Sequence, residues 1–194
     1  MERSDVHELI GARRAGVAAV ECGVNWMIKE LTASTFVVAV TDRWRVGLIV
    51  HPRMGVLIPA GGHVEPGESP AEAAVREVLE ESGLAVRLWP GPAMPLPEGF
   101  PHPPTAAPWW MVEMAAAPDS HTREPHVHVD FAYVAVAEAV VPVRVPECDV
   151  RWLDAAQVAE TPGISEDSRL QAKQVLVCVA DRDRGTPPYP SGAA

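Results

Sequence analysis

Cysteine, positive charge and long apolar runs are all scarce in this chain of 194 residues. The three cysteines, Cys22, Cys148 and Cys178, stand far apart and form no CxxC pair, so we expect reduced thiols in a cytoplasmic protein. No apolar run reaches the roughly 18 residues of a membrane-spanning helix, and the charged N-terminus resembles no signal peptide. We therefore expect no membrane partner.

Positive charge is outnumbered, with 16 lysines and arginines against 26 aspartates and glutamates and a net charge of −10. An acidic surface repels polyanions, so we expect no binding to DNA or RNA. A chain of this charge that handles phosphates needs a local source of positive charge, which a metal ion supplies.

Short apolar runs separated by turn residues fill most of the chain, and their order predicts one α+β domain. The last helix is expected to bury Leu170, Val175, Leu176 and Val179. The predicted elements are strands over 32–41, 45–52, 55–64, 108–117, 126–139 and 148–153, and helices over 70–82, 154–160 and 166–181.

Three segments fall outside this pattern. Residues 1–31 carry a capping-box pair, Asp5 and Glu8, and predict an N-terminal helical extension before a domain over 32–184. Residues 88–125 hold half of the prolines and predict a long irregular segment. The tail, 185–194, is predicted to be disordered.

The helix over 70–82 carries clear start and stop signals. Ser69 suits the N-cap, Pro70 the first turn and Glu72 the N3 position of a capping box, while Gly83 suits the residue after the helix. Within the helix, Glu77, Glu80 and Glu81 project from one face.

These three glutamates invite two interpretations. The first is a solvated acidic face, but Arg76 is the only base in the helix, and the helix dipole disfavours negative charge near a C-terminus. The second is a set of hard oxygen donors for Mg²⁺ or Mn²⁺. The second interpretation explains the clustering, because a cation offsets the repulsion.

The stretch from Gly62 to Leu84 resembles the Nudix box, Gx5Ex7REUxEExGU with U bulky and aliphatic, and meets all its fixed positions. The resemblance to this MutT-like superfamily implies an α/β/α sandwich with a mixed central sheet. It also implies hydrolysis of a nucleoside diphosphate linked to another group X, with divalent cations and an activated water. Many relatives are dimers, which makes a homodimer one candidate for the oligomeric state.

The resemblance also implies roles for matched residues. Glu77, Glu80 and Glu81 resemble the metal ligands of the family, with the Gly61 carbonyl as a further donor. Glu77 is also placed to orient or deprotonate the attacking water. Glu68 and Arg76 resemble the pair that supports the loop and helix of the box.

The remaining candidate residues lie outside the fixed positions of the box, so the sequence evidence for each of them is less specific. Glu138 suits the additional carboxylate that many relatives recruit, or simply a solvated strand end; Glu113 and Glu147 are weaker candidates. His126, His128 and Asp130 alternate along one strand and share a face, which suits either a substrate or metal site or a hydrogen-bonded polar face.

Two further side chains are candidates for substrate contact. His63 lies in the loop of the box, near the expected path of the phosphates. Trp109 can stack on a base, although packing in the core is the commoner fate of tryptophan.

The predicted function is Mg²⁺- or Mn²⁺-dependent cleavage of a pyrophosphate bond in a small nucleotide-type metabolite. One alternative is an enzyme like isopentenyl-diphosphate isomerase, which needs a catalytic cysteine and a metal-binding histidine set that the sequence alone does not place. The other is a catalytically silent ligand-binding or regulatory module, against which the intact box argues.

Overall fold

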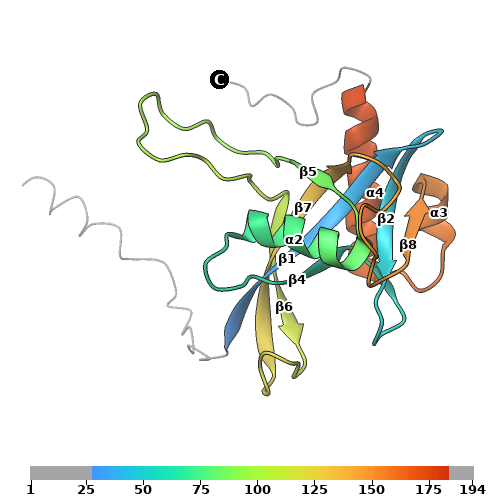
Figure 1. The fold of residues 1–194 in the computed structure, drawn as a ribbon, viewed down its shortest axis with the longest axis horizontal. Helices are drawn as coiled ribbons and strands as arrows, with labels where there is room; N and C mark the ends of the chain where they lie inside the picture. The colour runs from blue at the N-terminus through green and yellow to red at the C-terminus, as the bar shows by residue number, and fades with distance from the viewer. Residues whose placement is uncertain (1–27, 184–194) are drawn as a thin grey trace, which may run out of the picture.

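A single mixed β-sheet forms the centre of the computed structural model, which describes residues 28–183 (Figure 1). Within these residues the strands are β1 (Lys29–Val40), β2 (Trp44–Val50), β3 (Leu57–Ile58), β4 (Ala60–His63), β5 (Val86–Trp89), β6 (Trp110–Ala116), β7 (His126–Ala137) and β8 (Val150–Leu153). The helices are α2 (Pro70–Ser82), α3 (Ala155–Glu160) and α4 (Glu166–Asp183).

The two longest strands, β1 and β7, lie side by side in parallel, in a register that pairs Glu30 with His128 and Thr32 with Asp130. The strand order is β3-β2-β1-β7-β5, with β4 also paired to β1, β6 to β7 and β8 to β2. Every pairing except β1 with β7 is antiparallel. The predicted mixed sheet is therefore confirmed.

Alternate residues of β1 face opposite layers of the fold. Phe36 and Val38 are buried in a cluster that includes Val175 and Val179 of α4. Val37 is buried with Val78 of α2 on the other face. Because a strand alternates its side chains, one apolar strand binds a helix layer on each side. This arrangement confirms the predicted α/β/α sandwich.

Several boundaries differ from the prediction. β1 begins at Lys29, earlier than the strand predicted to start at residue 32. The predicted strand over 55–64 is two strands, because Pro59 has no N–H for the ladder; β3 pairs with β2 and β4 with β1. The segment 88–125, predicted to be irregular except for a strand over 108–117, contains that strand as β6 and also the end of β5, and the loop between β5 and β6 extends away from the sheet (Figure 1).

One predicted core residue is wrong. Leu170, assigned to the apolar side of the last helix, is 62% exposed, whereas Val175, Leu176 and Val179 are buried as predicted. Leu170 lines a cavity together with Ser168 and Gln171 of the same helix, so its side chain faces open space instead of the core. Between residues 28 and 183, no helix combines the length and apolar character needed to cross a membrane. Of the helical extension predicted over 1–31, residues 1–27 lie outside the described residues, as does the tail over 185–194, and residues 29–31 belong to β1.

Candidate active site

The helix α2 begins and ends with the predicted caps. The Glu72 N–H donates to Ser69 Oγ, and the Ser69 N–H donates to the Glu72 carboxylate at 2.8 Å, which completes the capping box. Gly83 ends the helix in the left-handed region, at φ +69°, and its N–H donates to the Leu79 carbonyl. The caps fix which residues share a face of the helix.

The Arg76 guanidinium connects the loop before α2 to the glutamates on the helix. Its Nη2 and Nε donate to the two Glu68 oxygens, at 2.6 and 3.1 Å. Nη1 donates to Glu77 Oε1 at 2.8 Å and to Glu80 Oε2 at 3.1 Å. Nη2 also reaches the His63 carbonyl at 2.9 Å. Only the planar fork of arginine can serve so many acceptors at once.

Two of the three glutamates lie against the backbone of the glycine pair. The Gly61 N–H donates to Glu81 Oε2 at 2.8 Å. A Cβ atom built on Gly62 would lie 2.4 Å from Glu77 Oε1, so a side chain there would occupy the place of the carboxylate. Glycine at position 62 therefore lets Glu77 approach the chain.

Burial raises the pKa of Glu77 and Glu81 above the ordinary value, in the case of Glu81 to about 7. Neighbouring negative charge, including that of Glu77, Glu147 and Glu80, adds to the rise for Glu81, and the bond from the Gly61 N–H opposes it. Buried carboxylates that repel one another are relieved by a cation. An all-oxygen donor set of this kind fits Mg²⁺ or Mn²⁺.

A cavity of about 960 Å³ adjoins this cluster. Its walls include the backbone of Gly61 and Gly62, the strands β1, β6 and β7, and the first turns of α4. This volume lies in the range of small-molecule sites. The cavity thus meets the glutamate cluster at the glycine pair.

Outside the box, the carboxylate whose charge acts on Glu81 is Glu147. The next residue, Cys148, donates its backbone N–H to the Glu81 carbonyl at 2.8 Å, which joins this segment to the end of α2. Glu138 is exposed just after β7 and donates its backbone N–H to the Ala85 carbonyl. Glu113 forms an exposed ion pair with Lys29.

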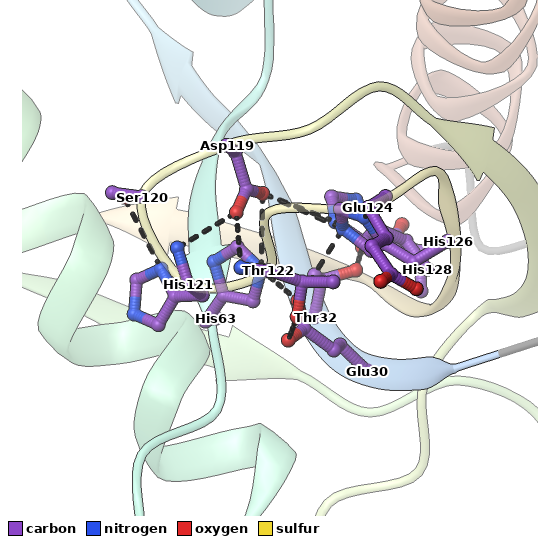
Figure 2. A network of polar contacts seen from close by, with 11 residues as sticks. Glu30, Thr32, His63, Asp119, Ser120, His121, Thr122, Glu124, His126 and His128 are labelled. Carbon is purple, nitrogen blue, oxygen red and sulfur yellow. Dashed lines mark hydrogen bonds and ion pairs between the residues drawn. The ribbon is translucent and has the colours of Figure 1, made fainter.

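The polar residues of β7 face the cavity and the loop before the strand. Asp130 is buried and accepts hydrogen bonds from Thr32 Oγ1 at 2.9 Å and Ser34 Oγ at 2.7 Å, and it lines the cavity with His128. His126 and His128 lie with His63 in one group of polar contacts (Figure 2). The structure thus brings together all three histidines predicted as substrate contacts.

Trp109 does not line the cavity. It is 7% exposed, belongs to the hydrophobic core, and donates its indole N–H to the Trp89 carbonyl. The neighbouring Trp110 lines the cavity instead. Trp110 also packs against the same core, with its ring centroid 6.4 Å from that of Phe36, so it lies between the core and the cavity.

The family model of the NUDIX domain matches residues 31–174, which is well over half of the chain. The chain belongs to the Nudix family. Its box is the loop and helix that carry Glu68, Arg76 and the three glutamates.

Known proteins similar to this Nudix chain extend the comparison. A Bacillus subtilis protein named "Putative 8-oxo-dGTP diphosphatase" is 40% identical over 57 residues, which is 29% of this chain and 38% of that protein. The chain therefore spans about two fifths of the curated relative that it matches.

Solved Nudix structures show the same fold. A NUDIX-family hydrolase from Clostridium perfringens superposes with a TM-score of 0.62 at 23% identity, covering 79% of this chain and 99% of that one. A MutT protein from Bacillus halodurans gives a TM-score of 0.50 at 24% identity, covering 76% and 82%. At these identities the likeness establishes the fold alone.

Two residues at this end of the Nudix sheet had no signal in the sequence. Glu30 contacts His63, and Asp119 lies near all three histidines, although neither belongs to a motif. The register of β1 on β7 brings Glu30 beside His128, and this register cannot be read from either segment alone.

Proposed function

We propose that this protein is a Mg²⁺- or Mn²⁺-dependent hydrolase that cleaves a pyrophosphate bond in a nucleoside diphosphate linked to another group. The observation that supports this most is the set of carboxylates that Arg76 and the glycine pair hold together on one side of α2. A set of repelling, partly buried acids is costly unless it binds a cation.

Glu77, Glu80 and Glu81 would hold the metal, with the Gly61 carbonyl as a further donor. A bound divalent ion neutralises phosphate charge and lowers the pKa of a water molecule. Glu68 acts through Arg76 as a positioning residue, because it accepts two of the arginine's hydrogen bonds. Glu77, with its raised pKa, is suited to accept a proton from water.

Glu147 is our choice for the additional carboxylate, in place of Glu138. Its charge contributes to the raised pKa of Glu81, and the Cys148 N–H ties its segment to the last turn of α2. Both residues are exposed, so the choice rests on the charge of Glu147, which acts on Glu81, whereas Glu138 is not among the acids that raise the Glu81 pKa most.

The adjoining cavity would take the nucleotide or the group X. Apolar side chains of β6 (Trp110, Val112 and Met114) form one wall, and the buried carboxylate of Asp130 is a polar acceptor beside them. A wall of this kind suits a flat ring with N–H donors. The name of the Bacillus subtilis relative makes oxidised dGTP one compound to test.

An enzyme like isopentenyl-diphosphate isomerase needs both a metal-binding histidine set and a catalytic cysteine, and the described residues offer only the first. His63, His126 and His128 do gather. However, Cys148 is buried and its pKa is raised, first by burial and then by Glu81 and other acids, and Cys178 is buried in the core. A thiol in such surroundings is a poor nucleophile. Among the described cysteines, none suits the catalysis.

A substrate screen tests the proposed hydrolase activity directly. The full chain is screened with Mg²⁺ or Mn²⁺ against nucleoside triphosphates, oxidised dGTP, ADP-ribose, NADH, diadenosine polyphosphates, CoA, capped RNA and isopentenyl diphosphate. We expect metal-dependent pyrophosphate cleavage that falls by about 10² or more in Glu80→Gln, since a metal ligand is lost.

Glu65→Gln is the matched control, because Glu65 is exposed in the same loop and contributes its backbone N–H to Glu68. It should keep wild-type turnover. Wild-type activity in Glu80→Gln, or a reaction that proceeds in EDTA, would contradict the assignment of the site. Binding of one of these compounds without turnover would favour the alternative of a catalytically silent ligand-binding module.

A further inference from the structure

A second group of side chains of the types that bind metals lies apart from the glutamates of the box. It consists of His63 from β4, His126 and His128 from β7, Glu30 from β1 and Asp119 from the loop before β7 (Figure 2). One ligand atom from each residue lies within 4.8 Å of every other. We call these five residues the histidine group.

The two carboxylates each present one oxygen to the histidines. Glu30 Oε2 is 2.8 Å from His63 Nε2 and 3.4 Å from His126 Nε2. Asp119 Oδ2 is 3.5 to 3.7 Å from the Nε2 atoms of His126, His63 and His128. The ring nitrogens of His126 and His128 are 2.9 Å apart. All the nearest atoms are therefore potential ligands.

These separations match the edges of a coordination polyhedron. With metal–ligand bonds of about 2.1 Å, neighbouring ligand atoms lie roughly 3.0 Å apart in an octahedron and roughly 3.4 Å apart in a tetrahedron. The contacts between 2.8 and 3.7 Å fall around those values. A small contraction of the widest pairs would bring every atom within bonding range of one ion.

In each of the two carboxylates, the oxygen that does not face the histidines accepts hydrogen bonds that hold it in place. Asp119 Oδ1 accepts from the backbone N–H groups of His121 and Thr122, at 2.8 and 2.9 Å. Glu30 Oε1 accepts from the Thr122 hydroxyl. The bonds from Thr122 are the main cause of the lowered pKa of both Glu30 and Asp119, so both carboxylates are charged near neutral pH. Such outer contacts orient ligands in metal sites.

The ring of His126 is also held by a hydrogen bond on the side away from the group. Its Nδ1 is 2.9 Å from the Glu124 carbonyl oxygen, which can only accept a hydrogen bond. Nδ1 therefore carries the proton, and in the neutral ring Nε2 keeps a lone pair directed at the group. The ring is 1% exposed, and the nearest atom that this lone pair meets among the group is His128 Nε2, at 2.9 Å.

We infer that the histidine group binds a divalent transition-metal ion of the Zn²⁺ class, at a site separate from the glutamates of the box. Three imidazole nitrogens favour zinc, cobalt or nickel over magnesium, whereas the box offers oxygen alone. Two carboxylates balance the charge of one divalent ion. His63, Asp119 and His128 also line the cavity, so an oxygen of a bound substrate can complete the coordination.

Co²⁺ is the probe, because its visible absorption reports nitrogen ligands, and the readout needs no substrate. The full chain is stripped with EDTA, dialysed, and titrated with Co²⁺ in excess Mg²⁺, which fills the oxygen site. We expect one equivalent of Co²⁺ to bind with visible bands that Zn²⁺ abolishes. Wild-type protein that shows no such bands would overturn the inference without any variant.

His128→Ala and Asp119→Asn test the ligands, and His102→Ala is the control because His102 is exposed and outside the group. The first two should weaken Co²⁺ binding by at least about 100-fold, since losing an outer contact alone costs up to that much. Circular dichroism verifies that each variant folds. Equal affinity in all three variants would contradict the assignment.

Glu80→Gln separates this inference from the proposed function. It should lose hydrolysis yet keep the Co²⁺ bands. If the bands disappear in Glu80→Gln and persist in His128→Ala, the ion sits at the box glutamates and the histidine group is not a metal site.

Discussion

Gly61 and Gly62 are neighbours in the chain but face different parts of the molecule. A Cβ atom on Gly61 would lie 2.4 Å from the Ala33 carbonyl oxygen and 2.8 Å from Ser34 Cα, both backbone atoms of β1. A Cβ atom on Gly62 would meet only the carboxylate of Glu77 among its three nearest atoms. The first clash involves the sheet, and the second involves the end of a movable side chain.

The two alanine substitutions should therefore differ most in their effect on stability. Gly61→Ala should lower the free energy of unfolding by about 1–3 kcal/mol, because β4 must move away from β1. Gly62→Ala should cost less stability but reduce kcat by about 10², since displacing a catalytic group by about 1 Å has that effect. Urea unfolding and turnover of the substrate found in the screen measure both.

Each variant serves as the other's control. A Gly62→Ala protein with full turnover and a large loss of stability would show that Glu77 is free to move aside and that its position does not limit the rate.

At the scale of the element, α2 is defined by local signals, and the sequence predicted it well. Ser69, Glu72 and Gly83 satisfy the ends of the helix through partners within four residues, so a short window of sequence contains the whole explanation. The box pattern is local too, and it identified the family that the comparison confirms.

The N-cap gives a prediction about the element alone. Ser69→Ala removes an acceptor for the Glu72 N–H and should cost about 1 kcal/mol of stability. That corresponds to a fall of roughly 2–4 °C in Tm for a domain of this size. Turnover at 25 °C should stay near wild type, because Arg76 still holds the glutamates.

Thermal unfolding by circular dichroism and a rate assay at 25 °C measure the two quantities. Ser4→Ala is a change of the same kind in a residue outside the box. A Ser69→Ala protein that melts normally but loses turnover would instead place Ser69 in the catalytic machinery.

Features that depend on distant pairing were harder to predict. Glu30 joins the histidine group only because β1 pairs with β7 in the sheet. Asp119 joins it only because the loop before β7 brings its carboxylate close to His63. The apolar pattern placed Leu170 in the core because a helical stripe does not reveal where the helix overhangs a cavity. Trp109 lies in the core, the commoner of its two predicted fates, and Trp110 lines the cavity, a difference between neighbours that the pair of tryptophans in the sequence did not reveal.

At the scale of the whole molecule, the excess of negative charge makes stability depend on pH and metal. Burial and neighbouring acids raise the Glu81 pKa from 4.5 to about 7 in the folded protein without metal. The folded state then binds this proton more tightly than the unfolded state. Stability is therefore greatest below about pH 4.5 for this group and falls as the pH rises through about 7.

In EDTA, Glu81→Gln should thus be more stable than wild type at pH 8, by up to about 3 kcal/mol. The difference should shrink on acidification toward pH 5, where Glu81 is protonated in the folded wild type. Urea unfolding across this range measures it. Adding Mg²⁺ should stabilise the wild type more than the variant. A constant difference at every pH would mean that Glu81 does not titrate in this range.

The parallel contact of β1 with β7 also determines when the cavity can exist during synthesis. The box helix and the strands β1 to β4 are complete once the chain has reached Gly83. Glu30 and His63 can contact each other at that stage, but His128 must still emerge to join them, and Asp130 must emerge before Thr32 and Ser34 have its carboxylate as a partner. A ribosome-bound chain that ends before β7 therefore carries the acidic box while the central strand β1 still lacks its parallel neighbour. Such a nascent chain exposes the unpaired edge of β1, which makes it prone to aggregate until β7 emerges.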